Sequence, residues 1–180
     1  MKNIIQCILL TLMIMGLLSC VSEEIADLDD SIIEIIGPAI LMNPLEIHTQ
    51  VNEHFSINLR LEDVSNFMGV FAEIEYDTEF LFYENYELIE TDSSTLGVFD
   101  GDIFSFIEND TDDGLITVSL SVASGTMEGL AGEGDLVQLN FTATQQAETI
   151  LILTNSCRLT DNNMDEIPIV NLYNGVIYVE

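Results

Sequence analysis

Basic side chains are nearly absent from this sequence. Its 180 residues include three Lys and Arg against 32 Asp and Glu, which gives a formal net charge of −29 at pH 7. So little positive charge argues against nucleic acid and anionic lipid headgroups as partners, because both are polyanions. Lys2 is the only lysine. The rest of the chain therefore lacks the amine that Schiff-base chemistry or a phosphate-binding lysine requires.

Residue types that serve catalysis and metal binding are scarce as well. Tryptophan is absent, and His48 and His54 are the two histidines. A zinc site would need further nitrogen or sulfur ligands in range, and the sequence indicates none. Among so many carboxylates, no pair stands out as general acid and base. We therefore expect a non-catalytic protein without a cofactor, with both histidines facing solvent.

The N-terminus has a positive residue followed by an apolar run. Lys2 precedes the run from Ile4 to Leu18, which is too short for a comfortable membrane span. The run ends on Leu17-Leu18-Ser19-Cys20, which resembles the lipobox of bacterial lipoproteins. This resemblance implies that residues 1–19 are a signal peptide that is removed, and that Cys20 carries lipid. The alternative is an ordinary secretory signal that is cut near a cysteine.

The chain then divides into an anchor and a folded domain. We expect residues 20–38 to form a lipidated acidic tether and residues 39–180 to form the domain. The protein is expected in the bacterial cell envelope, at the outer membrane or cell surface, with the lipid as its only membrane contact. With Cys7 removed and Cys20 lipidated, Cys157 remains as a free thiol. An intrachain disulfide is then excluded, so buried apolar surface holds the domain together.

Beyond Pro38 the apolar residues recur with a period of two. Met68, Val70, Ala72, Ile74 and Tyr76 alternate with a second set made of Gly69, Phe71, Glu73 and Glu75. Similar short segments follow, separated by turn-forming residues, and no long segment has the helical period. The pattern predicts an all-β fold, an antiparallel β-sandwich.

Several turns are predicted between these strands. Ser65-Asn66 would separate two strands, and Gly132 to Gly134 would precede a strand whose inward residues are Val137, Leu139, Phe141 and Ala143. Asn174-Gly175 would form a two-residue hairpin turn before the last strand. Tyr76 would pack inward while the carboxylate of Asp77 caps the next turn.

The order of these landmarks resembles a cohesin module, the receptor domain that docks dockerins in cellulosome-type assemblies. The matching stretches are residues 55–77, residues 115–126, residues 132–143, Ile167-Pro168 and residues 175–179. The resemblance covers about residues 45 to 180. It implies a nine-stranded jelly roll of two packed sheets.

The same resemblance implies a partner-binding surface on one open sheet face. The positions that it assigns to this surface are Gly69, Phe71, Glu73, Glu75, Thr117, Ser119 and Ser121, with Gly125 beyond them. Well-known dockerin-binding cohesins have Asn and Asp near the positions of Gly69 and Phe71, where this chain departs from them. Phe71 is either an anchor for a partner or a side chain that a neighbouring loop covers.

One acidic loop has the ligand type that calcium prefers. Asp110, Asp112 and Asp113 precede Gly114, but the segment is one residue short of the beginning of an EF-hand loop. Ser121 occupies the place of the bidentate glutamate. We therefore expect a solvated hairpin that binds calcium weakly if at all.

Two functions are compatible with these observations. The first is a membrane-anchored protein-binding module whose partner carries a dockerin or a similar domain. The alternative is a carbohydrate-binding module on the same β-sandwich, which would bind polysaccharide through Phe71, Tyr83, Tyr86 and Tyr173. Sugar platforms usually present coplanar exposed aromatic rings. The lack of tryptophan ranks this alternative lower.

Overall fold

The computed structural model describes residues 34–89, 102–123 and 130–180. The predicted signal peptide, Cys20, most of the predicted tether and Gly125 lie outside these residues. Ile35–Glu180 form one compact unit. Its described part consists of strands and loops, and no helix there has the length and hydropathy needed to cross a bilayer.

Twelve strands are present in the described residues. They are β1 (Ala39–Asn43), β2 (Glu46–Thr49), β3 (His54–Glu75), β4 (Leu81–Leu88), β5 (Asp102–Asp110), β6 (Leu115–Ala123), β7 (Leu130–Ala143), β8 (Ala147–Leu153), β9 (Arg158–Asp161), β10 (Glu166–Ile167), β11 (Asn171–Tyr173) and β12 (Gly175–Val179).

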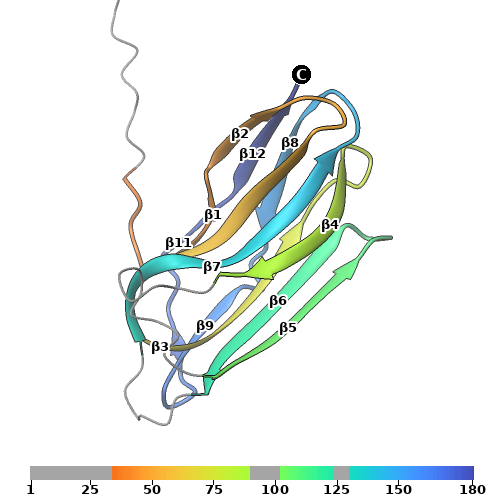
Figure 1. Cartoon of the computed structure of the whole chain (residues 1–180). Helices are drawn as coiled ribbons and strands as arrows, with labels where there is room; N and C mark the ends of the chain where they lie inside the picture. Colours follow the sequence, from red (N-terminus) through yellow and green to blue (C-terminus); the bar gives the residue numbers. More distant parts are fainter. Residues whose placement is uncertain (1–33, 90–101, 124–129) are drawn as a thin grey trace, which may run out of the picture. The chain divides into compact units, whose positions relative to one another are not determined.

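Strand β3 belongs to both layers of the sandwich. Its first half pairs with β7 and β1, and β4 and β11 extend that layer. Its second half pairs with β6 on one side and with β9 and β8 on the other, and β5 lies beyond β6. From β8 the pairing continues to β12 and β2, and β10 lies beside β9. Figure 1 shows β3 running from the upper strands to the lower ones. The predicted all-β sandwich of jelly-roll class is confirmed.

The core consists of the inward-facing side chains of both layers. In β3, Val70, Ala72 and Ile74 are at most 3% exposed, whereas the intervening Phe71 and Glu73 are half-buried. The other layer contributes the predicted inward set of β7, all fully buried: Val137, Leu139, Phe141 and Ala143. Burying a large apolar side chain stabilises the fold by about 1.5–3 kcal/mol. Burial of these alternating apolar side chains therefore stabilises the sandwich.

The turn predicted at Ser65-Asn66 is wrong, because β3 is one strand of 22 residues. Asp63 and Asn66 have positive φ angles of 51° and 56°, and the pairing with β7 shifts register on both sides of Val64. Such bulges bend a strand without ending it. The glycines of the predicted turn at Gly132 lie inside β7, on the partner side of the same bulges.

The hairpin predicted at Asn174-Gly175 is also wrong, because β11 and β12 do not pair with each other. The side-chain oxygen of Asn174 accepts a hydrogen bond from the Leu153 amide at 2.9 Å. A Cβ at Gly175 would lie 2.7 Å from Cδ1 of Ile57. The glycine therefore serves close packing. Breaks of this kind, at Asn174 and again at Pro44 between β1 and β2, raise the strand count above the nine expected.

The Tyr76-Asp77 pair has the predicted arrangement. Tyr76 is 7% exposed and packs edge-on against Phe141, with ring centroids 5.6 Å apart. Its hydroxyl donates a hydrogen bond to the side-chain oxygen of Asn109 at 3.0 Å. Asp77 Oδ1 accepts from the Glu79 amide at 2.9 Å. This end of β3 is thereby fixed against β5 and β7.

Candidate functional site

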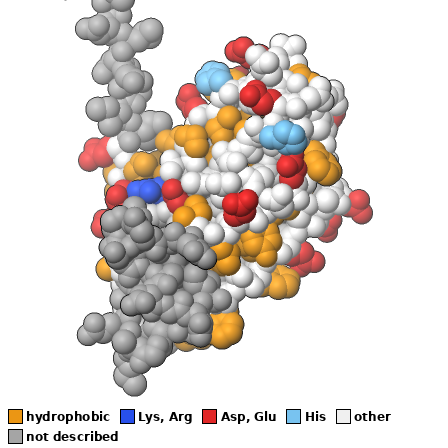
Figure 2. Space-filling view, viewed as in Figure 1, with side chains coloured by type: hydrophobic (Ala, Val, Ile, Leu, Met, Phe, Trp, Pro, Cys, Tyr) orange, Lys and Arg blue, Asp and Glu red, His pale blue; other side chains and the backbone are white. Residues whose placement is uncertain are grey.

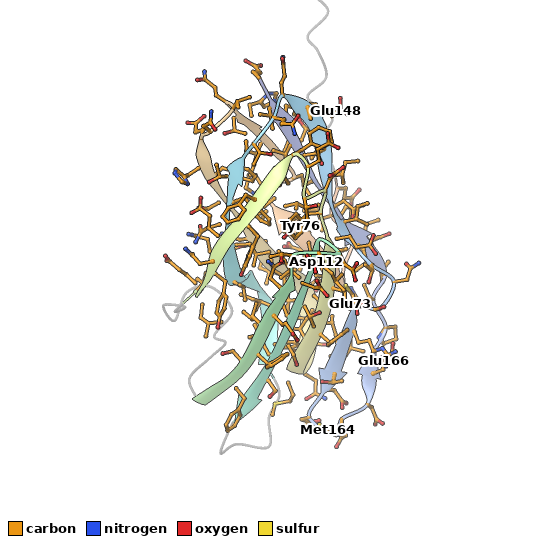
Figure 3. The ribbon with its side chains drawn as sticks, turned by 90° about the vertical axis from the view of Figure 1, so that its right-hand side faces the viewer. Glu73, Tyr76, Asp112, Glu148, Met164 and Glu166 are labelled. Carbon is orange, nitrogen blue, oxygen red and sulfur yellow. The ribbon has the colours of Figure 1, made fainter. Side chains whose placement is uncertain are left out.

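A groove of about 900 Å³ lies over the second half of β3. It is lined from β3, β6, β9 and their adjoining loops by Met68, Gly69, Val70, Phe71, Glu73, Ser119, Leu120, Ser121, Ser156, Arg158, Thr160 and Met164. We call it the β3–β9 groove. In Figure 3, Met164 lies toward the lower end of the molecule and Glu73 lies higher.

Strand pairing places four side chains in one row across this face. Phe71 lies opposite Ser119 of β6 and Arg158 of β9, and Ser119 lies opposite Phe106 of β5. Opposed residues of antiparallel strands point to the same side of a sheet. All four side chains therefore face away from the core, and Phe106 is 61% exposed.

The neighbouring row consists of smaller side chains with an aromatic residue at its end. It runs from Phe104 of β5 through Ser121 and Gly69 to Thr160 of β9. Phe104 is 66% exposed. A Cβ at Gly69 would lie 2.8 Å from Oγ1 of Thr160. Gly69 therefore lets β9 approach β3 and leaves the groove open beside Phe71.

Not all predicted partner-binding residues lie in the groove. Gly69, Phe71, Glu73, Ser119 and Ser121 line it. Thr117 lies on the same face, opposite Glu73, but outside the lining. Oε2 of Glu73 accepts a hydrogen bond from Oγ1 of Thr154 at 3.1 Å. The structure therefore brings these six residues together on one face.

Glu75 is set apart from this group. It is exposed and lines a separate hollow of about 580 Å³, with Tyr76, Asp77 and Glu148 among its neighbours. The eighth predicted residue, Gly125, lies outside the described residues.

Sequence reasoning missed five residues of this face: Phe104, Phe106, Arg158, Thr160 and Met164. Residues 103–107 are apolar at both parities apart from Ser105, so alternation alone does not choose a face. The usable signal was that Phe104 and Phe106 share their parity with Glu108 and Asp110, which are exposed. Strand β9 has four residues, too few for a clear periodic pattern.

The calcium candidates lie at the end of β5, where Asp110 is the last residue, and in the turn that leads to β6. Oδ1 of Asp110 accepts hydrogen bonds from the amides of Asp112 and Asp113 at 3.1 and 3.4 Å. One carboxylate oxygen is thus used to cap the turn. Within residues 34–89, 102–123 and 130–180, no group of three or more His, Cys, Asp or Glu is placed to hold a metal ion. Weak calcium binding stays a prediction.

Both histidines are exposed, as predicted. His48 stacks on Tyr178, with ring centroids 4.7 Å apart. His54 Nδ1 lies 2.5 Å from Oε1 of Glu84, which also accepts a hydrogen bond from the Thr142 hydroxyl. These hydrogen bonds lower the pKa of Glu84. His54 on β3 and Glu84 on β4 are exposed to solvent, and neither lines the hollows described above.

The four aromatics named for a sugar platform do not share one face. Phe71 lies in the β3–β9 groove. Tyr83 of β4 packs edge-on against Phe141, and burial raises the pKa of its hydroxyl to about 12. Tyr86 lies on β4, and the hydroxyl of Tyr173 accepts a hydrogen bond from the amide of Ile36. A coplanar stack of these rings on one sugar is therefore not formed.

Comparison with known proteins places the fold in a family. A family model described as Cohesin domain matches residues 46–179. A type I cohesin–dockerin complex from Clostridium thermocellum has a TM-score of 0.62 at 15% identity, covering 79% of this chain and 92% of that one. The sixth cohesin of Acetivibrio cellulolyticus scaffoldin B, in complex with a Cel5 dockerin, has a TM-score of 0.62 at 16% identity, with 81% and 100% covered.

A third similar structure is a non-cellulosomal cohesin from the archaeon Archaeoglobus fulgidus. Its TM-score is 0.58 at 13% identity, with 79% of this chain and 90% of that one covered. These identities show a shared fold alone. A search of curated proteins finds no match. Because the family model spans most of the chain, the chain belongs to the cohesin family.

Proposed function

We propose that this chain is a non-catalytic cohesin module that binds a dockerin-type protein outside the cytoplasm. The contact surface is the outward face of β5, β6, the second half of β3, and β9, which we call the β5–β9 face. Lipid on Cys20 attaches the module to the bacterial cell envelope. The observation that carries the proposal is the row of Phe106, Ser119, Phe71 and Arg158 across that face. Two similar cohesin structures, both complexes with dockerins, support the choice of partner.

The aromatic side chains of the β5–β9 face suit a protein partner. Phe104 and Phe106 are more than 60% exposed on adjacent rows, and the groove beside Phe71 can receive a side chain. Aromatic residues are enriched in the cores of protein interfaces, where a few of them supply most of the binding energy. Apolar packing would take the role of the polar contacts that Asn and Asp supply near Gly69 and Phe71 in other cohesins.

The test is dockerin binding with a matched pair of variants. The full chain is presented to a display library of dockerin modules, and the affinities of enriched clones are measured for Phe106→Ala and Phe82→Ala. These two phenylalanines are 61% and 59% exposed, but Phe82 lies on β4 in the other layer. We expect Phe106→Ala to weaken binding ~30-fold or more, as loss of an interface anchor of about 2 kcal/mol does. Phe82→Ala should bind within about twofold of the unaltered chain.

Two results would contradict the proposal. In the first, no dockerin is enriched above the level obtained with Phe106→Ala. In the second, both variants bind equally well, which would move the contact off the β5–β9 face. Retention of the chain on insoluble polysaccharide, with no dockerin bound, would favour the carbohydrate-binding alternative instead.

The proposed anchor is tested separately. We expect the full chain expressed in bacteria to partition into the detergent phase and to incorporate labelled palmitate. Cys20→Ala should abolish the label, because the thiol is the acceptor of the diacylglycerol. Cys7→Ala is the matched control and should leave the label unchanged. Labelling that survives Cys20→Ala would remove the lipoprotein assignment.

A further inference from the structure

We propose that Arg158 selects the partner by binding a carboxylate. The inference rests on the proposed function: the dockerin-type partner would place one Asp or Glu against Arg158, with apolar side chains next to it that pack on Phe71 and Phe106. The partner is therefore defined by chemistry, as an apolar patch that contains one acidic side chain.

Arg158 is unusual because no carboxylate of the described residues pairs with it. Arg60 and Arg158 are the two basic residues of the described part of the chain. Arg60 lies within 3.2 Å of Glu62 and of Glu133, and 3.7 Å from Asp135. Figure 2 shows basic side-chain atoms with acidic side chains on either side of them. No ion pair joins Arg158 to any described residue, although the chain has 32 carboxylates.

The surroundings of Arg158 explain this isolation. Its cross-strand neighbour on β3 is Phe71, and the groove lining on its own segment is Ser156 and Thr160. The nearest acid along β3 is Glu73, one row further on, whose Oε2 is engaged by Thr154. Arg158 therefore lies opposite an apolar side chain, and no hydrogen bond or ion pair joins its guanidinium to another residue that the structure describes.

Docking on this face would take the guanidinium out of water. A charge that loses its hydration on burial without gaining a partner is strongly destabilising. A partner that covers Phe71 and Phe106 therefore has to supply an acceptor for Arg158. A carboxylate is the best acceptor, because it matches the planar guanidinium with two parallel hydrogen bonds.

The charges of the face also give the partner a direction. Arg158 lies at one edge of the groove, whereas Glu73 and Glu108 occupy the next row, on β3 and β5. A partner with its acid over Arg158 and basic side chains over that row would satisfy both. The net charge of −29 favours approach of a partner that is basic overall. The partner's acidic side chain at Arg158 thus differs in sign from the rest of its surface, and it fixes the orientation in which the partner binds.

The experiment selects dockerins with two forms of the full chain. A display library of dockerin modules with randomised helix surfaces is enriched once on the unaltered chain and once on Arg158→Glu. We expect Asp or Glu at one shared position in the first set and Lys or Arg at that position in the second. For dockerins of the first set, Arg158→Gln should weaken binding ~10- to 100-fold, and Arg158→Lys should weaken it less.

Gln50→Glu is the matched control, since it makes the same change in net charge as Arg158→Gln at an exposed position beyond β2. Binding of Arg158→Gln within twofold of Gln50→Glu, together with no acidic preference in the first set, overturns this inference. Phe106→Ala would still weaken binding ~30-fold or more in that case, so the proposed function would stand. A library that gives no enrichment over Phe106→Ala overturns both. If Arg158→Gln folds poorly, the residue preference among the dockerins selected by the unaltered chain still tests the inference.

Discussion

Cys157 illustrates at the scale of one residue how burial sets reactivity. Its side chain is 7% exposed, and Sγ lies 3.7 Å from the carbonyl oxygen of Glu73. Burial raises the pKa of the thiol. The thiolate, which is the reactive form, is therefore scarce at pH 8.

We expect Cys157 to resist iodoacetamide in the native protein at pH 8. Peptide mapping by mass spectrometry should show little alkylation of this residue until guanidinium unfolds the chain, when modification becomes rapid. Rapid labelling of Cys157 under native conditions would show that the thiol reaches solvent.

The residues of the β5–β9 face show how far sequence reasoning reaches. Alternation with Val70 and Ala72 predicts that Phe71 and Glu73 face outward, and in the structure Val70 and Ala72 are buried while Phe71 and Glu73 are half-buried. Phe106 was missed, because Ile107 beside it is equally apolar and only half-buried at the edge strand β5. Arg158 was missed because its role depends on Phe71, more than 80 residues earlier in the chain. Pairing between distant strands is not encoded in local periodicity.

At the scale of elements, a hydrogen bond joins a bulge of β3 to the end of β9, where the next loop begins. Asn66 Nδ2 donates to Oδ2 of Asp161 at 3.1 Å. Oδ1 of Asp161 accepts from the amides of Asn163 and Asp165 at 2.8 and 2.9 Å. Desolvation raises the pKa of Asp161, but these hydrogen bonds outweigh it, and the net pKa is lowered. This carboxylate thus organises the loop that carries Met164 at the end of the groove.

The lowered pKa gives this loop a defined pH dependence. A carboxylate with a depressed pKa stabilises the fold above its unfolded pKa of about 4, and this contribution is lost as pH falls through the lower, folded pKa. The difference in unfolding free energy between the unaltered chain and Asp161→Asn should therefore shrink as the pH falls from 6 through the ordinary aspartate pKa of about 4 and then below the lowered pKa of Asp161. Asp113→Asn, in the exposed β5–β6 turn, is the control. Urea titrations at each pH give the comparison, and a difference independent of pH would contradict the assignment.

The elements that the sequence did not predict share a physical cause. Strand β1 was missed because Ala39, Ile40, Leu41 and Met42 are all buried, so the segment has no alternation. The two strands expected on either side of Ser65-Asn66 are one strand, since positive φ at Asp63 and Asn66 absorbs the bend. Turn-forming residues mark a change in backbone direction, but a bulge and a turn have the same signature.

At the scale of the whole molecule, the net charge affects the stability of the fold. A charge of −29 on 180 residues destabilises the compact state through self-repulsion, and salt screens that repulsion. We expect the Tm to rise by several degrees between roughly 10 and 300 mM NaCl, because the screening length falls from about 30 Å to well below 10 Å. Differential scanning calorimetry measures this. A Tm that is flat or falls with salt would mean that repulsion is not a major cost.

Specific binding of calcium is distinguished from general charge screening by comparing the Tm in CaCl₂ and in NaCl at the same ionic strength. We expect CaCl₂ and NaCl to raise the Tm about equally, because Asp110 already uses one carboxylate oxygen to cap the β5–β6 turn. An extra rise in calcium that Asp112→Asn removes would indicate a specific site in this turn.

The most direct test of the account is a hydroxyl-radical footprint of the full chain with and without a selected dockerin. Oxidation of each side chain is read by mass spectrometry, so one experiment compares both layers of the sandwich. We predict that Phe104, Phe106 and Met164 become protected in the complex, while Phe82 on β4 is oxidised at its free rate. Protection of Phe82 with Phe106 unchanged would contradict the claim that the β5–β9 face receives the partner.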